Sequence, residues 1–88
     1  MRITVVEDNI GLARGIAYRL QDDGHSVDIL ENGTDADLFL QQEHADLVIL
    51  DINLPGKSGL ELLDELRRRG DPKPVILLTA RSSTQDRV

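Results

Sequence analysis

Acidic residues directly follow two separate apolar segments of this chain. Glu7 and Asp8 come after residues 3–6, and Asp51 comes after residues 47–50. An ionised carboxylate at the end of a buried segment is costly unless something pairs with it. If the three carboxylates converge, they repel one another, and a hard divalent cation such as Mg²⁺ would relieve that repulsion. The pattern therefore predicts a Mg²⁺ site.

Asp51 could also do chemistry on phosphorus, because a carboxylate can attack a phosphoryl group and form an aspartyl phosphate. A third apolar segment, residues 75–78, runs into Thr79 and Ala80. The hydroxyl of Thr79 could donate to a phosphoryl oxygen, and Ala80 is small enough to let the group approach. We therefore predict that Asp51 is a phosphoryl acceptor that the metal keeps ionised.

Each of these residues also has an ordinary structural interpretation. Glu7 and Asp8 could be solvated loop acids, with Asp8 or Asn9 capping a helix. Asp51 could form an Asx turn ahead of a Pro-Gly pair, and Thr79 could be an ordinary threonine at a strand end. These interpretations lose weight because the motifs occur together, each after its own predicted strand.

The elements that must position these residues are short apolar strands alternating with amphipathic helices. Strands are expected at residues 3–6, 27–29, 47–50 and 75–78. Apolar residues at helical spacing indicate the first helix: Leu12, Ala13, Ile16, Ala17 and Leu20. The second helix is expected to bury Ala36, Phe39 and Leu40, and Leu60, Leu63 and Leu66 mark the third.

Capping residues indicate where the helices begin. Asn9 is expected to cap the first helix. Thr34 with Asp37 and Ser58 with Glu61 resemble capping boxes for the second and third, and Ser83 with Asp86 for one more. Gly24 and Gly70 are expected to end the first and third helices.

The βαβαβαβ order predicts an α/β fold, a doubly wound parallel sheet with helices on both faces. Ligands of such sheets bind at the carboxyl ends of the strands. Glu7, Asp8, Asp51 and Thr79 all lie at such ends, which supports one common site.

Composition restricts the classes of protein to consider. The chain has 88 residues, 40% of them hydrophobic and 30% charged, which is typical of one small soluble domain. Its net charge of −6 argues against direct nucleic acid binding, and its short apolar runs argue against a membrane span. The absence of cysteine excludes disulfides and thiolate metal sites. We expect a cytoplasmic location, because the N-terminus turns acidic too early for a secretory signal.

Together, three motifs resemble the receiver domain of two-component response regulators. They are residues 5–9, residues 50–56 with Ser58 and Gly59, and residues 76–80. The likeness spans residues 1–88 and is most similar to regulators that carry a C-terminal winged-helix DNA-binding domain. It implies a flavodoxin-like receiver fold of strand order 2-1-3-4 that forms a single domain. It also implies that this domain passes its signal to an output domain absent from this chain.

The resemblance also implies a role for each matching residue. Asp51 would accept a phosphoryl group from a sensor histidine kinase. Asp8 and Asp51 would ligate Mg²⁺ together with the main-chain carbonyl of Asn53, and Glu7 would help through water. Thr79 would move toward the phosphoryl group and signal its presence. The Asn53 side chain would influence phosphoryl hydrolysis, or only shape the turn.

One part of the family's pattern is missing. Receiver domains carry a fifth strand, whose terminal lysine pairs with the phosphoryl group, and a final helix, so we expect this chain to be the N-terminal portion of a longer regulator. Its two lysines are Lys57 and Lys73. Lys73 precedes its strand and is expected about 17 Å from the site, and Lys57, in the loop after Asp51, is a weak substitute. Phosphorylation of this chain is expected to be low, with metal binding less affected.

Two other functions remain open. A haloacid-dehalogenase-like phosphatase also uses a strand-end aspartate, but it needs a second aspartate where this chain has Asn53. A pseudo-receiver would bind partners without phosphorylation. A phosphorelay role for His25 or His44 is disfavoured, because both are expected near helix ends.

The last strand predicts self-association. In the implied strand order, residues 75–78 form a sheet edge that is apolar on both faces and has unpaired backbone groups. Such an edge invites pairing with another chain. We therefore expect a dimer or higher assembly joined at or near this strand.

Overall fold

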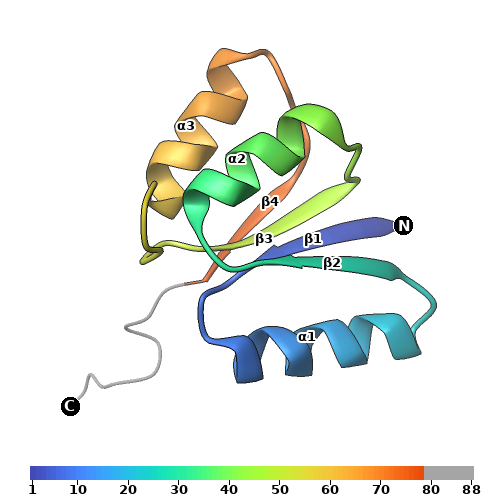
Figure 1. Ribbon diagram of the computed structural model, residues 1–88. Coiled ribbons are helices and arrows are strands. Elements are labelled where there is room, and N and C mark those ends of the chain that lie inside the picture. The colour runs from blue at the N-terminus through green and yellow to red at the C-terminus, as the bar shows by residue number, and fades with distance from the viewer. Residues whose placement is uncertain (79–88) are drawn as a thin grey trace.

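The computed structural model describes residues 1–78, in which strands and helices alternate (Figure 1). The elements are β1 (Arg2–Val6), α1 (Ile10–Asp22), β2 (Ser26–Leu30), α2 (Gly33–Gln42), β3 (Leu47–Asp51), α3 (Gly59–Arg68) and β4 (Val75–Leu78). Neighbouring strands are parallel and follow the order β2-β1-β3-β4. The doubly wound sheet and the strand order predicted from the sequence are confirmed.

The sheet lies between two helical layers, with α1 on one face and α2 and α3 on the other (Figure 1). Successive side chains of a strand point to opposite faces. Val5 of β1 accordingly packs with Ala13 of α1, whereas Val6 packs with Leu40 of α2 and Leu62 of α3. Both faces of β1 and β3 are therefore mostly apolar, as expected of central parallel strands, and Thr4 and the strand-end Asp51 are their buried polar residues.

Two of the predicted helix starts are confirmed. The side chain of Asn9 accepts a hydrogen bond from the Leu12 N–H (3.1 Å), which caps α1. The Ser58 hydroxyl accepts from the Glu61 N–H (3.2 Å), and the Glu61 carboxylate accepts from the Ser58 N–H (3.0 Å). These reciprocal bonds form the capping box at the start of α3.

The predicted start of the second helix was wrong. Asn32 caps α2, because its side-chain oxygen accepts from the Asp35 N–H at 2.8 Å. Thr34 consequently lies inside the first turn of α2. The carboxylate of Asp37, assigned to a capping box, pairs instead with Lys57 and Arg69.

The buried face of α3 is not the row of leucines that marked the helix in the sequence. Leu62 and Leu66 are fully buried, Leu63 is half-buried, and Leu60 is 53% exposed. The reason is the placement of Gly59 against the backbone at the end of β3. Residues three and seven positions later then face the sheet, and the residue next to Gly59 turns to solvent.

The C-terminal features expected from the sequence all follow residue 78. Thr79, Ala80 and the helix start predicted at Ser83 and Asp86 lie outside the described residues. Within residues 1–78, no helix is both long enough and apolar enough to cross a membrane.

Candidate functional site

The carboxyl ends of β1 and β3 bring the three predicted acidic residues together. The two strands are neighbours in the sheet, with Val6 of β1 paired to Leu50 of β3. One carboxylate oxygen from each of Glu7, Asp8 and Asp51 lies within 4.8 Å of the others. The predicted convergence of these carboxylates is confirmed.

The three carboxylates differ in their exposure to solvent. Glu7 is only 4% exposed and Asp51 only 7%, whereas Asp8 is exposed. The Asn9 N–H donates to Glu7 Oε2 at 3.0 Å, and the Asn53 N–H donates to Asp51 Oδ1 at 3.3 Å. Two main-chain donors thus face two buried acids, and the cluster as a whole stays open to solvent through Asp8.

Electrostatics in this cluster disfavour a full set of negative charges. Burial raises the pKa of Glu7, the Asn9 N–H opposes that rise, and the charge of Asp51 and hydrogen bonding with Asp8 add to it. A hard divalent cation fits this donor set, since it consists of oxygen ligands and carries excess negative charge. The arrangement can therefore hold a metal ion beside Asp51.

Close backbone packing holds the main chain at Asp51 against the start of α3. The Gly59 N–H donates to the Ile52 carbonyl oxygen at 2.9 Å, which brings the start of α3 against the end of β3. A Cβ atom added at Gly59 would overlap the Asp51 carbonyl oxygen. Only glycine allows this approach, so the backbone of Gly59 packs directly against the backbone of Asp51.

The loop after β3 places the remaining predicted residues. Asn53 is exposed, two residues beyond Asp51. The ammonium group of Lys57 lies 2.6 Å from Glu65 Oε1 and 3.3 Å from Asp37 Oδ2. Lys57 is therefore engaged with α2 and α3, which argues against its use as a substitute partner for a phosphoryl group.

Sequence reasoning missed the ion pairs of Lys57. Asp37 lies 20 residues away from Lys57 in the chain and had been assigned to a helix cap. No local spacing rule connects an α2 carboxylate to a loop lysine, so only the packing of the two segments could show this contact.

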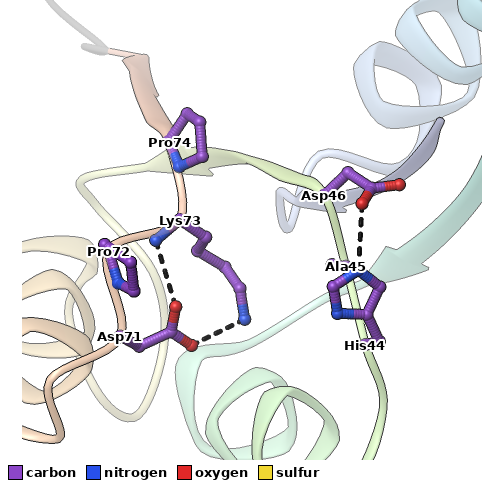
Figure 2. A pocket seen from close by; sticks show the side chains of 7 residues that line it. All are labelled: His44, Ala45, Asp46, Asp71, Pro72, Lys73 and Pro74. Atoms are coloured by element: carbon purple, nitrogen blue, oxygen red, sulfur yellow. Dashed lines mark hydrogen bonds and ion pairs between the residues drawn. The ribbon is translucent and has the colours of Figure 1, made fainter.

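A cavity of about 340 Å³ lies at the opposite, amino-terminal end of β3 and β4 (Figure 2). Lys73 pairs with Asp71 there, with Nζ 2.7 Å from Oδ2. Lys73 thus precedes β4, as predicted, and lies at the far end of the strand from Asp51. The lining residues are His44, Ala45, Asp46, Asp71, Pro72, Lys73 and Pro74.

The two histidines also lie at this amino-terminal end. His44 Nε2 is 2.9 Å from Asp46 Oδ1 (Figure 2), and His25 Nδ1 is 3.1 Å from the amino group of Met1. These contacts give both rings structural partners, and neither ring belongs to the carboxylate cluster.

This chain is similar to known sequences of one protein family. A family model described as the response regulator receiver domain matches residues 3–88. The chain is 47% identical to the transcriptional regulatory protein TctD and 42% identical to the virulence transcriptional regulatory protein PhoP, both of Salmonella typhimurium. Each match covers the whole chain but only 39% of the relative, so the chain spans about two fifths of their length.

Solved structures show the same fold. The response regulator TrrA from Thermotoga maritima, solved in complex with Mg(2+)-BeF, has a TM-score of 0.86 and 39% identity over 99% of this chain and 76% of that one. The Francisella response regulator 1452 receiver domain has a TM-score of 0.88 and 26% identity over 97% of this chain and 70% of that one. Since the family match spans nearly the whole sequence and the sheet order agrees, this chain belongs to the response regulator receiver domain family.

Proposed function

We propose that this chain is a phosphoacceptor, in which Asp51 takes a phosphoryl group from a sensor histidine kinase in the presence of Mg²⁺. One observation carries the proposal: the carboxylate oxygens of Glu7, Asp8 and Asp51 lie within 4.8 Å of one another at the strand ends. The haloacid-dehalogenase-like phosphatase considered from the sequence has no support in the comparisons, which favour the receiver family.

Asp8 and Asp51 are the proposed carboxylate ligands of Mg²⁺, with the main-chain carbonyl of Asn53 as third protein ligand. Glu7, nearly buried and next to Asp8, would assist through water. Bound Mg²⁺ would neutralise charge on the carboxylates and on an incoming phosphoryl group. The Mg(2+)-BeF complex of TrrA supports this choice of metal, because TrrA shares the fold at 39% identity.

In the proposed transfer, an Asp51 carboxylate oxygen forms the new bond to phosphorus while the bond from phosphorus to the kinase's histidine nitrogen breaks. The buried position of Asp51 limits access of other nucleophiles to that phosphorus. The Asn53 side chain, exposed beside it, would influence later hydrolysis. Thr79 and Ala80, which lie outside the described residues, keep their proposed roles in contacting and admitting the phosphoryl group.

A pseudo-receiver that acts without phosphorylation is the second candidate. The engagement of both lysines favours it, since Lys57 pairs with Asp37 and Glu65 and Lys73 pairs with Asp71. Within this chain, no other lysine is present to neutralise a phosphoryl group. The two candidates differ in whether a small phosphodonor modifies Asp51.

The signal would pass by conformational change to a DNA-binding output domain. TctD and PhoP are named transcriptional regulators, and this chain covers 39% of each, which supports such an arrangement. The cytoplasmic location expected from the sequence stays a prediction.

Metal binding is tested by thermal melting of the chain with and without Mg²⁺. A ligand that binds only the folded state stabilises it by about 2.7 kcal/mol at one hundred times its dissociation constant. The melting temperature should rise with Mg²⁺ concentration, and Asp8→Ala should abolish the rise. A shift that survives Asp8→Ala would place the metal elsewhere.

Phosphoryl acceptance is tested by intact mass after incubation with a small phosphodonor and Mg²⁺. A mass gain of one phosphoryl group should map to Asp51 and disappear in Asp51→Asn. A gain that maps to a serine or histidine would contradict the proposal. No gain in a chain that still binds Mg²⁺ through Asp8 would favour the pseudo-receiver.

We also propose self-association at β4. Among the described residues, β4 pairs with β3 and with no other strand, and Ile76 on it is 50% exposed. A second β4 could satisfy the backbone groups along this edge. Sedimentation velocity over a range of concentrations should show a dimer or larger species. A folded monomer at every concentration would contradict this part of the proposal.

A further inference from the structure

The loop that follows Asp51, residues 52–58, is held against the first turns of α2. The Gly33 N–H donates to the Pro55 carbonyl oxygen at 3.2 Å. A Cβ atom added at Gly33 would overlap the Lys57 carbonyl oxygen, so the two backbones are in direct contact. The start of α2 therefore forms a backbone surface on which this loop rests.

A partly buried ion pair connects the same loop to α2. Lys57 Nζ lies 3.3 Å from Asp37 Oδ2, and the Asp37 side chain is only 14% exposed. Burial raises the pKa of Asp37, but hydrogen bonds from Gln41, Lys57 and Arg69 outweigh that effect and the net pKa is lowered. Asp37 is thus a stable anion facing the loop.

Lys57 is also tied to α3, since its ammonium group lies 2.6 Å from Glu65 Oε1. Hydrogen bonding with Glu65, the larger contribution, and with Asp37 raises the pKa of Lys57. One loop cation therefore joins two helices. The loop also buries Leu54 in the core beneath them.

The position of this loop matters for the metal site, because Asn53 lies in it between Asp51 and the contact points at Pro55 and Lys57. We propose that Lys57, through its ion pairs with Asp37 and Glu65, is a positioning residue for the metal site: it holds the loop where the Asn53 carbonyl can complete the ligand set. This inference rests on the proposed function. It predicts that loosening the loop weakens Mg²⁺ binding without removing any ligand.

The chain offers a matched control on the same carboxylate. Arg69 Nη1 lies 3.2 Å from Asp37 Oδ1, so Asp37 has two cationic partners at nearly equal distance. Lys57 sits in the loop, whereas Arg69 is the C-terminal cap residue of α3. Lys57→Gln and Arg69→Gln each remove one partner of Asp37. Lys57→Gln also removes the partner of Glu65, and only this change loosens the loop.

The test measures the Mg²⁺ dissociation constant by isothermal titration calorimetry on the wild-type chain, Lys57→Gln, Lys57→Arg and Arg69→Gln. A partly exposed ion pair of this kind corresponds to a change of about two- to fivefold in an equilibrium constant. Lys57→Gln should weaken Mg²⁺ binding by that factor. The Mg²⁺ dissociation constant of Arg69→Gln should equal that of the wild type within error. Lys57→Arg should retain most of the wild-type Mg²⁺ affinity.

Hydrogen exchange of the metal-free chain supplies a readout of the loop itself. Amides of residues 52–58 should exchange faster in Lys57→Gln than in Arg69→Gln, with α1 amides equally protected in both. This comparison separates a released loop from a chain that is less stable everywhere.

Equal Mg²⁺ affinities for the wild type and Lys57→Gln would overturn this inference and leave the proposed function standing. An equal loss in Lys57→Gln and Arg69→Gln would also overturn it, because the effect would then come from Asp37 or from stability. If the wild type shows no Mg²⁺ binding that depends on Asp8, the proposed function fails and this inference fails with it.

Discussion

Replacing the candidate phosphoacceptor with its amide, Asp51→Asn, should stabilise the metal-free protein. The substitution removes one of three negative charges whose oxygens lie within 4.8 Å of one another. It keeps an oxygen that can still accept the hydrogen bond from the Asn53 N–H. The variant therefore changes the charge of the cluster with little change in its shape.

The magnitude follows from Coulomb's law. Two unit charges 4.8 Å apart repel by about 1 kcal/mol in water and about 3 kcal/mol at an effective dielectric constant near 20. Asp51 has two such neighbours, of which Asp8 is exposed and weakly coupled and Glu7 is nearly buried. After allowance for screening, we expect a gain of about 1–2 kcal/mol, or about 5–10 °C in melting temperature.

Thermal melting followed by circular dichroism, in EDTA at low and high KCl, measures this effect. The gain should shrink at high salt, and added Mg²⁺ should stabilise the wild type more than the variant. Asp64→Asn is the control for net charge, because Asp64 is an exposed acid of α3 that pairs with Arg68. It should be neutral or destabilising by a few tenths of a kcal/mol.

Two results would refute this reasoning. Asp51→Asn could fail to stabilise the metal-free chain, which would mean that the cluster's repulsion is already compensated within the protein. Alternatively, Asp64→Asn could stabilise as much, which would assign the gain to the chain's overall charge of −6.

Other substitutions test the frame around the site. Thr4→Val should raise the free energy of unfolding by about 1–2 kcal/mol in chemical denaturation, since the buried Thr4 hydroxyl has no hydrogen-bond partner among the described residues; no gain would mean that the hydroxyl is satisfied. Gly59→Ala should cost about 3 kcal/mol, because its Cβ would overlap the Asp51 carbonyl. Gly15→Ala, in α1 with nothing near an added Cβ, should instead gain about 0.5–1 kcal/mol, and the same sign for both would contradict the packing argument. The pKa values of Asp37 and Asp71 are lowered from 3.8, so the stability they contribute is present above that pH and lost as pH falls through their folded values. Denaturant unfolding from about pH 5 down to pH 2 should show this loss, and Asp37→Asn should reduce it.

Much of the candidate site could be predicted because its residues lie at strand ends. Each strand is a short apolar run, so its carboxyl end is readable from the sequence, and parallel pairing then brings those ends to one edge. The clustering of Glu7, Asp8 and Asp51 could therefore be predicted without knowledge of side-chain packing. The prediction for Thr79, which follows β4 in the sequence, rests on the same reasoning, and Thr79 lies outside the described residues.

Local choices between near-equivalent residues were harder to predict. Asn32 and Thr34 are both acceptable N-cap residues. Which of them caps α2 depends on where the chain leaves β2. The leucines of α3 allow two faces, and the contact of Gly59 with the end of β3 selects the one containing Leu62 and Leu66. Tertiary packing made each choice, so local spacing alone could not.

The carboxylate cluster destabilises the metal-free fold for the same physical reason that gives it its proposed affinity for a cation. The repulsion among Glu7, Asp8 and Asp51 is present when the chain folds without a metal, and a bound cation removes it. The free energy that this repulsion costs on folding is therefore recovered when a cation binds, provided that the loop and the start of α3 hold the carboxylates in place. Asp51→Asn should accordingly gain stability without metal and lose Mg²⁺ stabilisation, and the loss should grow with Mg²⁺ concentration. A large loss with no gain would mean that Asp51 contributes ligation alone, and that the cluster stores no repulsion.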